Sequence, residues 1–429
     1  MNRFLFALAA ALFALAGASA QALPSFARQT NLDCSSCHLS WLELTATGRQ
    51  FKLAGYTWGE RPEIPLAGMV QVTRTQTRDT RGNDEAFPKD RDVVLQEAAL
   101  FAAGRITEHS GAFVEWAYDG VEHHNAIDAV DVRYARQLGD GANATIYGFT
   151  LNNNPTLQDV YNTTPAWGFP FASSDVAATP NAATIIESLG QQVVGFGAYT
   201  LWRKTLYAEV SAYRTADRAF SLFRAGHARD EASVIKGLNP YWRLALQHEW
   251  EGKHSAMIGT YGMDVEKYPD SLDPTGPTDR FRDIAFDAQY QYIGPLDHRY
   301  SAQVNYIREK QAWRSGAASN ASNRLGTLRA KATYYSGNEY GINVGYFSTR
   351  GTSDQALYAN GEPVSGSANA SPNTRGHIVE LNYLPRRDLR LVLQYTGYDR
   401  FNGAKNDYDG FGRNARDNNS LLLLLWYMI

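Results

Sequence analysis

The chain has 429 residues and a formal net charge of −3, with 41 Lys and Arg against 44 Asp and Glu. The charges form no basic stripe, which argues against nucleic acid as a partner. Mean hydropathy is −0.39, and after the first twenty residues no apolar run is long enough for a transmembrane helix. The 25 Tyr, 9 Trp and 36 Gly instead favour a membrane β-barrel, whose strands each give a weak signal.

Residues 1–20 have the order of a secretory signal peptide. Asn2–Arg3 supplies a short positive start, Phe4–Ala16 is almost wholly apolar, and Ala18–Ala20 is a small-residue cleavage site. The apolar run is too short to serve comfortably as a membrane anchor. We therefore expect the mature chain to begin near Gln21, beyond the inner membrane and in an oxidising compartment.

Residues 21–65 show no strand alternation and contain both cysteines of the chain, in Cys34-Ser35-Ser36-Cys37-His38. Cys-x-x-Cys-His is the attachment signature of c-type haem. The two thiols would form thioethers to the porphyrin, and His38 would bind the iron as proximal ligand. So short a segment cannot build its own core, so we expect it to pack on the haem and on the rest of the chain.

The same motif has three other interpretations. A thioredoxin-like redox pair expects a βαβ context, which this sequence lacks. A zinc site needs three or four ligands, and only three candidates cluster here. A structural disulfide between Cys34 and Cys37 would not require His38. One covalent haem c is therefore the favoured cofactor.

The second axial ligand of the iron is commonly His or Met. Met69 is the candidate, because it follows the haem segment and shares its strand face with Gln71, Thr73 and Thr75. Met69 could instead simply pack beneath the N-terminal segment. The remaining methionines after the signal peptide are Met257, Met263 and Met428.

The histidines elsewhere are weaker candidates for the iron. Those expected at or beside short turns are His109, His254 and His298. We expect His123 and His124 to form a solvated pair in a short loop. His248 and His377 fall on a lipid-facing parity near strand ends, where an interfacial role is expected.

From Leu66 to the C-terminus the hydrophobic pattern has period two. In Tyr300–Tyr306, for example, apolar and aromatic residues alternate with Ser, Gln and Asn. The pattern predicts about sixteen strands, or fourteen if two are merged. The predicted strands are 66–77, 92–106, 111–119, 126–138, 143–151, 190–203, 205–214, 239–250, 254–263, 281–293, 298–308, 323–335, 339–349, 376–384, 388–399 and 418–428.

The predicted connections alternate between short turns and mostly long polar loops. Outer-membrane barrels have this arrangement, with short periplasmic turns and long extracellular loops. We therefore predict an all-β fold: a transmembrane antiparallel barrel over residues 66–429, with the haem segment 21–65 docked in or at it and both termini in the periplasm. The apolar faces would contact lipid, and the polar faces would line a wet lumen with Asp131, Arg133, Arg329, Lys331 and Arg390.

Three stretches resemble the fused monohaem cytochrome–porin family, whose best-known members are outer-membrane iron-oxidising cytochromes. They are Ala22–Thr30 followed by Cys34-x-x-Cys37-His38, then Leu44–Tyr56, and then Leu151–Phe171. The first two match densely over the N-terminal region, whereas the remainder agrees in architecture more than in detail. The resemblance implies haem on Cys34 and Cys37, with His38 axial, in a Gram-negative outer membrane.

The resemblance also implies a function, namely electron uptake from an extracellular donor, with Fe(II) as the expected donor and a periplasmic c-type cytochrome or similar carrier as acceptor. The chain would then be a one-electron oxidoreductase, and no acid–base or nucleophilic residues are apparent or needed. Two alternatives stay open: a transport porin whose haem segment is a plug or sensor, and electron export to an external acceptor. The loop around Asn152–Phe171 is expected over or in the barrel mouth, covering the haem's outer edge.

Overall fold

The computed structural model describes residues 23–40, 42–164, 172–228 and 233–429. The expected signal peptide and its cleavage site lie outside these residues, as do Trp167, Phe169 and Phe171 of the long loop. Within the described residues, no helix has the length and apolar character needed to cross a membrane.

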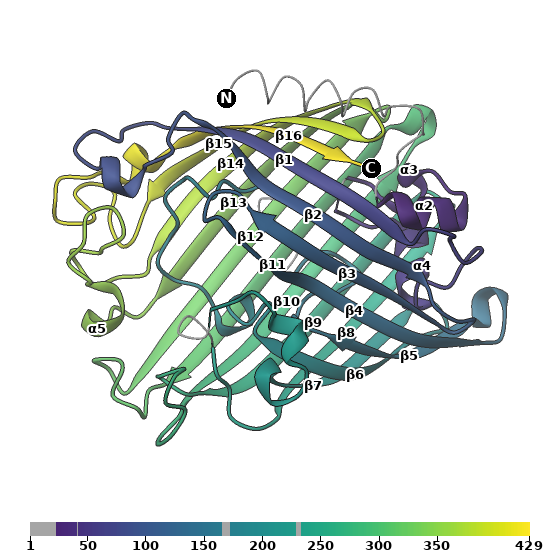
Figure 1. Cartoon of the computed structure of the whole chain (residues 1–429), viewed down its shortest axis with the longest axis horizontal. Coiled ribbons are helices and arrows are strands. Elements are labelled where there is room, and N and C mark those ends of the chain that lie inside the picture. The colour runs from purple at the N-terminus through teal and green to yellow at the C-terminus, as the bar shows by residue number, and fades with distance from the viewer. Residues whose placement is uncertain (1–22, 41, 165–171, 229–232) are drawn as a thin grey trace.

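Sixteen antiparallel strands form one closed barrel in which each strand pairs with its neighbours in sequence and β1 pairs with β16 (Figure 1). This confirms the predicted fold class and strand number. The strands are β1 Leu66–Thr77, β2 Val93–Arg105, β3 Ser110–Asp119, β4 His124–Leu138, β5 Thr145–Asn152, β6 Val193–Trp202, β7 Leu206–Thr215, β8 Asn239–Trp250, β9 His254–Lys267, β10 Asp279–Ile293, β11 Arg299–Ala312, β12 Ser322–Ser336, β13 Tyr340–Gly351, β14 Thr374–Arg386, β15 Leu389–Arg400 and β16 Ser420–Met428.

The period-two pattern separates the two faces of the barrel wall, as predicted. On β11, Tyr300 and Tyr306 point outward and are exposed, whereas Ser301 and Asn305 point inward and are buried. On β16, leucines alternate in the same way between the exposed and buried faces. The outer face is thus an apolar band suited to hydrocarbon, and closure leaves no unpaired strand edge.

The two ends of the barrel differ. Short turns join the strands at one end, which we call the turn end: 106–109, 139–144, 203–205, 251–253, 294–298, 337–339 and 387–388. Longer connections lie at the other end, which we call the loop end: 78–92, 120–123, 153–192, 216–238, 268–278, 313–321, 352–373 and 401–419. Only 120–123 is brief, so the rim of the barrel is low between β3 and β4.

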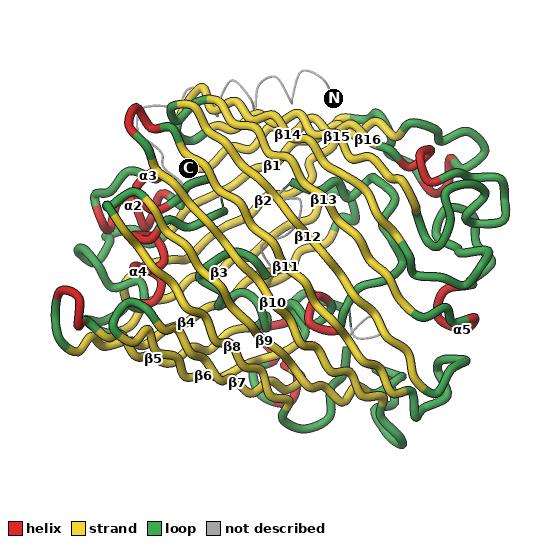
Figure 2. The backbone as a smooth tube through the Cα atoms, turned by 180° about the vertical axis from the view of Figure 1, so that it is seen from behind, coloured by secondary structure: helices red, strands yellow, loops and turns green. Residues whose placement is uncertain are grey.

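Among the residues described before the barrel, three short helices are present: α2 Pro24–Thr30, α3 Cys34–Cys37 and α4 Ala46–Leu53. Figures 1 and 2 show all three at the turn end, beside the C-terminus. Pro24 opens α2 at a position where its missing N–H costs nothing. The other helices in the described part of the chain are α5 Gln355–Tyr358 and the 3₁₀ helices η1 Asp84–Ala86, η2 Gly141–Asn143, η4 Ile185–Glu187, η5 Ala216–Arg218, η6 Ser221–Arg224, η7 Pro295–Asp297 and η8 Ala415–Asn418.

The loop between β5 and β6 turns into the lumen, as far as its described residues show. Asp159 lies 3.5 Å from the guanidinium of Arg243 on β8, which also pairs with Asp287 on β10. The Tyr161 hydroxyl donates to Gln247 at 2.9 Å. Asp159, Tyr161, Arg243 and Asp287 are all buried. The loop therefore occupies the middle of the barrel, where an open porin would hold water.

Candidate functional site

The motif Cys34–His38 is held on a compact pair of helices. Both cysteines are half-buried in α3, and the His38 N–H donates to the Cys34 carbonyl at 2.8 Å. Thr45 joins the motif to α4, because its hydroxyl donates to the Ser36 carbonyl at 2.6 Å and accepts from the Gly48 N–H at 3.3 Å. Thr45 is thus the N-cap of α4 and also holds the motif against this helix through its hydrogen bond to Ser36.

The N-terminal segment docks on the lumen wall through buried polar contacts. Arg49 of α4 donates to Gln291 of β10 at 2.8 Å, and Tyr56 donates to Asp131 of β4 at 2.6 Å. The carboxylate of Glu43 accepts from Ser301 at 2.9 Å. Because these partners come from distant strands, the segment is positioned by the closed barrel rather than by local structure.

A cavity of about 530 Å³ opens beside the motif, within the range of about 300–1,000 Å³ usual for small-molecule and cofactor sites. Cys34, Cys37 and His38 line it. Its apolar and aromatic wall combines the N-terminal segment with β2, β3 and β16 and includes Phe26, Phe51, Phe101, Phe113 and Trp426.

The electrostatics of the motif favour a neutral imidazole and disfavour a redox-active dithiol. His38 Nδ1 is buried and has no hydrogen-bond partner among the described residues, and burial lowers the pKa of His38 to about 4. The imidazole is therefore neutral at pH 7 and able to ligate a metal. Burial, together with Cys34, raises the pKa of Cys37 to about 11, whereas redox-active cysteines have lowered pKa values.

Two methionines line the same cavity. Met69 of β1 and Met428 of β16 are direct cross-strand partners where the barrel closes, and both are buried and reach the cavity. The amide of Gln71 lies 3.7 Å from the Met69 sulfur. Met69 thus lies where the sequence places it, on the lumen side and next to the haem motif, and it has a neighbour of identical chemistry.

Four carboxylates form the polar wall of the cavity: Glu97 on β2, Glu115 on β3, Asp128 on β4 and Asp175 in the β5–β6 loop. Glu97 accepts from Gln71 at 2.7 Å, and Asp128 accepts from Gln191 at 2.8 Å. Among the residues the structure describes, none of the four has a Lys or Arg within 4.0 Å. We refer to Glu97, Glu115, Asp128 and Asp175 as the acidic row.

Sequence reasoning did not identify Met428 or the acidic row as parts of a site. The position of Met428 was predictable, because the first and last predicted strands must pair when the barrel closes. Residues that face each other across this pair lie on the same face of the wall, so Met428 lies beside Met69. The acidic row has no such signal in the sequence. Its members come from three strands and a loop, and only the register of the barrel brings them together.

The other candidates for the iron lie elsewhere. On the outer face, His254 forms a hydrogen bond of 2.9 Å with Tyr290, and His298 forms one of 2.9 Å with Tyr334. Both pairs belong to an aromatic belt typical of barrel interfaces. His109 packs edge-on against Tyr134. The lumen-facing Met257 and Met263 and the outward-facing His248 and His377 do not line the cavity either.

Comparisons with known proteins relate the chain to porins by fold. No family model and no curated protein matches the sequence. Among solved structures, Salmonella typhi OmpF in complex with Daunomycin is 13% identical, covers 85% of this chain and 97% of its own, and has a TM-score of 0.51.

The outer membrane channel DcaP of Acinetobacter baumannii is 14% identical over 85% of this chain and 96% of its own, with a TM-score of 0.47. The anion-selective porin from Comamonas acidovorans is 11% identical over 85% and 98%, with a TM-score of 0.43. At 13% identity, the similarity to OmpF shows the fold alone: a closed barrel of the outer-membrane porin kind. The resemblance to the fused cytochrome–porin family stays a prediction.

Proposed function

We propose that the chain is an outer-membrane electron-transfer protein. It takes single electrons from an extracellular donor, Fe(II), through one haem c bound to Cys34 and Cys37, and delivers them to a periplasmic c-type cytochrome or similar carrier. In this proposal the turn end and both termini face the periplasm, and the loop end faces outward.

One observation carries the proposal: a Cys-x-x-Cys-His motif opens into a cavity inside the barrel instead of onto its surface. The apolar band of a barrel, roughly 25 Å tall, separates donor and acceptor. A redox group within the barrel shortens the distance that an electron must cross from each side, whereas a group on either surface would leave the full distance on the other side. The raised pKa of Cys37 argues against a dithiol redox pair, whose cysteines have lowered pKa values.

When bound, the haem supplies a one-electron couple whose potential depends on its axial ligands and its burial. The residues of this chain attach it, ligate it and limit its contact with water. Each Fe(II) would give up one electron and leave as Fe(III). No proton transfer or covalent step at a side chain is required.

Stopped-flow mixing of the purified, oxidised protein with Fe(II) tests the proposal, after haem staining of an outer-membrane gel has located the cofactor. We expect Fe(II) to convert the oxidised haem spectrum to the reduced one. If Fe(II) leaves the spectrum unchanged while another external donor reduces it, the iron assignment is wrong. If protein reduced with dithionite is not reoxidised by any external couple, the electron-transfer function itself is wrong.

A second candidate is a transport porin in which the haem segment is a plug or sensor. The porin-like fold favours it directly, since fold similarity by itself implies no electron transfer. The buried Arg243 cluster and the loop across the lumen oppose it, because they occupy the path that a solute would take. A third possibility is export of electrons to an external acceptor, since the direction of flow depends on the potentials of the partners.

A further inference from the structure

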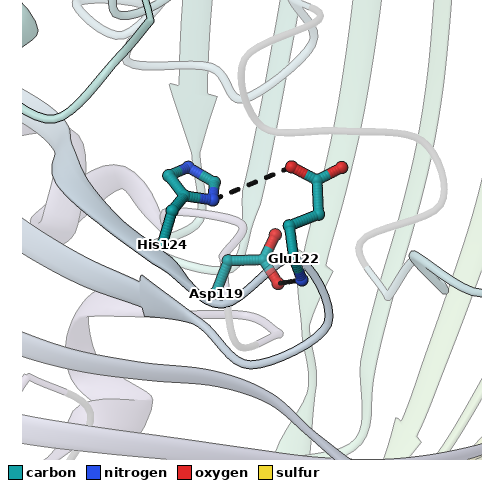
Figure 3. Close-up of side chains that lie close together, drawn as sticks. All are labelled: Asp119, Glu122 and His124. Atoms are coloured by element: carbon teal, nitrogen blue, oxygen red, sulfur yellow. Dashed lines mark hydrogen bonds and ion pairs between the residues drawn. The ribbon is translucent and has the colours of Figure 1, made fainter.

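The low rim of the barrel carries a cluster of metal-ligand side chains. Asp119 ends β3, Glu122 lies in the brief connection, and His124 begins β4. One ligand atom from each lies within 4.8 Å of the other two. Figure 3 shows the three side chains converging on one space. We call Asp119, Glu122 and His124 the rim triad.

The loop contacts of the triad leave ligand atoms available. Oδ1 of Asp119 accepts from the N–H groups of Val121 and Glu122 at 2.7 and 2.9 Å, which fixes the loop and leaves Oδ2. His124 Nδ1 lies 3.7 Å from a Glu122 oxygen. The nearby ammonium of Lys89 donates to the Val121 carbonyl and forms no ion pair with the triad in the described part of the chain.

The rim triad interacts with the acidic row. Asp175 is near enough to Asp119 and Glu122 to interact with both carboxylates. Glu97 interacts in the same way with Asp175 and Asp128, and Glu115 with Asp128 and Glu97. The rim triad is therefore electrostatically coupled, through Asp175, to the carboxylates of the cavity that Cys34 and His38 line.

In the part of the chain that the structure describes, the acidic row lacks the cationic partners that two buried carboxylates of the lumen have. Asp131 lies 2.8 Å from Arg133, and Glu380 lies 2.7 Å from Arg390. Buried carboxylates need such a counter-charge, because desolvation otherwise opposes their ionisation. Among the described residues, the acidic row has no Lys or Arg within 4.0 Å, and its side chains are half-buried or, for Asp175, exposed. Carboxylates that line one wall of a cavity raise the local concentration of cations there.

We propose that Asp119, Glu122 and His124 bind a divalent transition-metal cation at the loop end, and that the acidic row guides it toward the haem cavity. Two carboxylates with one imidazole suit first-row divalent metals. Three protein ligands leave coordination positions for water, so the metal can exchange. The inference rests on the proposed function, because it names the place where the Fe(II) donor would bind.

Mn(II) is a suitable probe, since it is visible by electron paramagnetic resonance and binds without reducing the haem. We expect titration of the full-length, haem-loaded protein to show one site that weakens at least about tenfold in both His124→Ala and Glu122→Gln. The matched controls His123→Ala and Glu85→Gln, with exposed side chains of the same types at the same end, should bind like the wild type. Unchanged Mn(II) affinity in both triad variants would overturn the inference.

The acidic row is tested separately with Asp175→Asn. We expect this variant to keep its Mn(II) affinity within about twofold, well short of the tenfold loss on removing a ligand, but to show slower haem reduction by dilute Fe(II). Its reduction by dithionite, an anion, should not slow. Fe(II) reduction at the wild-type rate would remove the row from the proposal. If Mn(II) binding depends on the triad but Fe(II) never reduces the wild-type haem, the cation site stands and the proposed function fails.

Discussion

His38 combines two properties that determine how the protein should respond to its loss. It is the expected iron ligand, yet its main contacts to the barrel are through backbone atoms, including a carbonyl that accepts from Arg299 at 3.0 Å. We therefore expect His38→Ala to assemble into the membrane but to lose the low-spin haem spectrum and Fe(II)-dependent reduction. A heat-modifiability gel checks assembly, and an absorption spectrum checks the haem. A variant that fails to assemble would show a structural role instead.

Because Met69 and Met428 lie side by side, either could be the distal iron ligand, and substitutions can tell which one it is. A thioether ligand raises the haem potential, so removing the distal ligand should lower the potential and change the spectrum. We expect one of Met69→Leu and Met428→Leu to do so and the other to leave both properties nearly unchanged. Redox titration with optical detection distinguishes them. If neither substitution has an effect, neither methionine ligates the iron.

For single residues, the sequence predicts sites formed by neighbouring residues in the chain and misses sites formed by residues that only the fold brings together. Five consecutive residues carry the haem motif, so the haem prediction for Cys34, Cys37 and His38 depends on the sequence alone and stays a prediction. The partnership of Met69 with Met428 and the convergence of Glu97 with Asp175 depend on segments far apart in the chain. The alternation shows that such residues face the lumen, but not which of them meet.

Among the helices, the packing of α3 on α4 depends on Gly48. A Cβ at this position would lie 2.2 Å from the carbonyl oxygen of Cys37, far inside van der Waals contact. We expect Gly48→Ala to separate the two helices and to lower the yield of protein with attached haem, measured by haem staining per unit of barrel. Gly82→Ala is a poor control, because Gly82 has a positive φ of 71°. Ala46→Gly, in the first turn of the same helix, should have a small effect.

The loop between β5 and β6 is fixed in the lumen by a buried ion pair that can be broken selectively. Arg243→Ala leaves Asp159 and Asp287 without their counter-charge, which typically costs about 3–5 kcal/mol. Arg282→Ala is the control, because its pair with Asp264 is exposed and is worth at most about 1 kcal/mol. Thermal unfolding followed on gels should give Arg243→Ala a midpoint temperature well below those of the wild type and the control. Equal midpoints would contradict the role of the ion pair.

The strands were predictable in detail, whereas the helices were not. Alternation alone located β1 and β8 to the residue, because a wall between lipid and water forces opposite polarity on neighbouring side chains. The predicted 254–263 is too short, since β9 runs to Lys267, beyond the band where alternation is strict. The helices α2, α3 and α4 are short and form on the barrel surface that receives them, so their sequence carries little periodic signal.

The whole molecule has a porin wall around a filled interior. Large polar and aromatic side chains in the lumen are almost completely buried, among them Arg133, Arg243, Tyr207 and Tyr261. We therefore expect the wild-type protein in a planar lipid bilayer to conduct far less than an open sixteen-stranded porin. Arg243→Ala, which frees the loop, should raise the conductance. High and stable conductance in the wild type would favour the transport alternative over electron transfer.

The junction of β1 with β16 also has a temporal consequence. Gly68 and Ile429 exchange backbone hydrogen bonds at 2.7 and 2.9 Å, and this last contact places Met428 opposite Met69. Before the ends of the barrel meet, the pocket beside Cys34 and Cys37 has no complete wall. Under the proposed function, joining haem to these thiols would require an uncovered motif, so attachment would precede closure of the barrel. Pairing of the final strand with β1 would thus complete the wall of the pocket after the cofactor is bound.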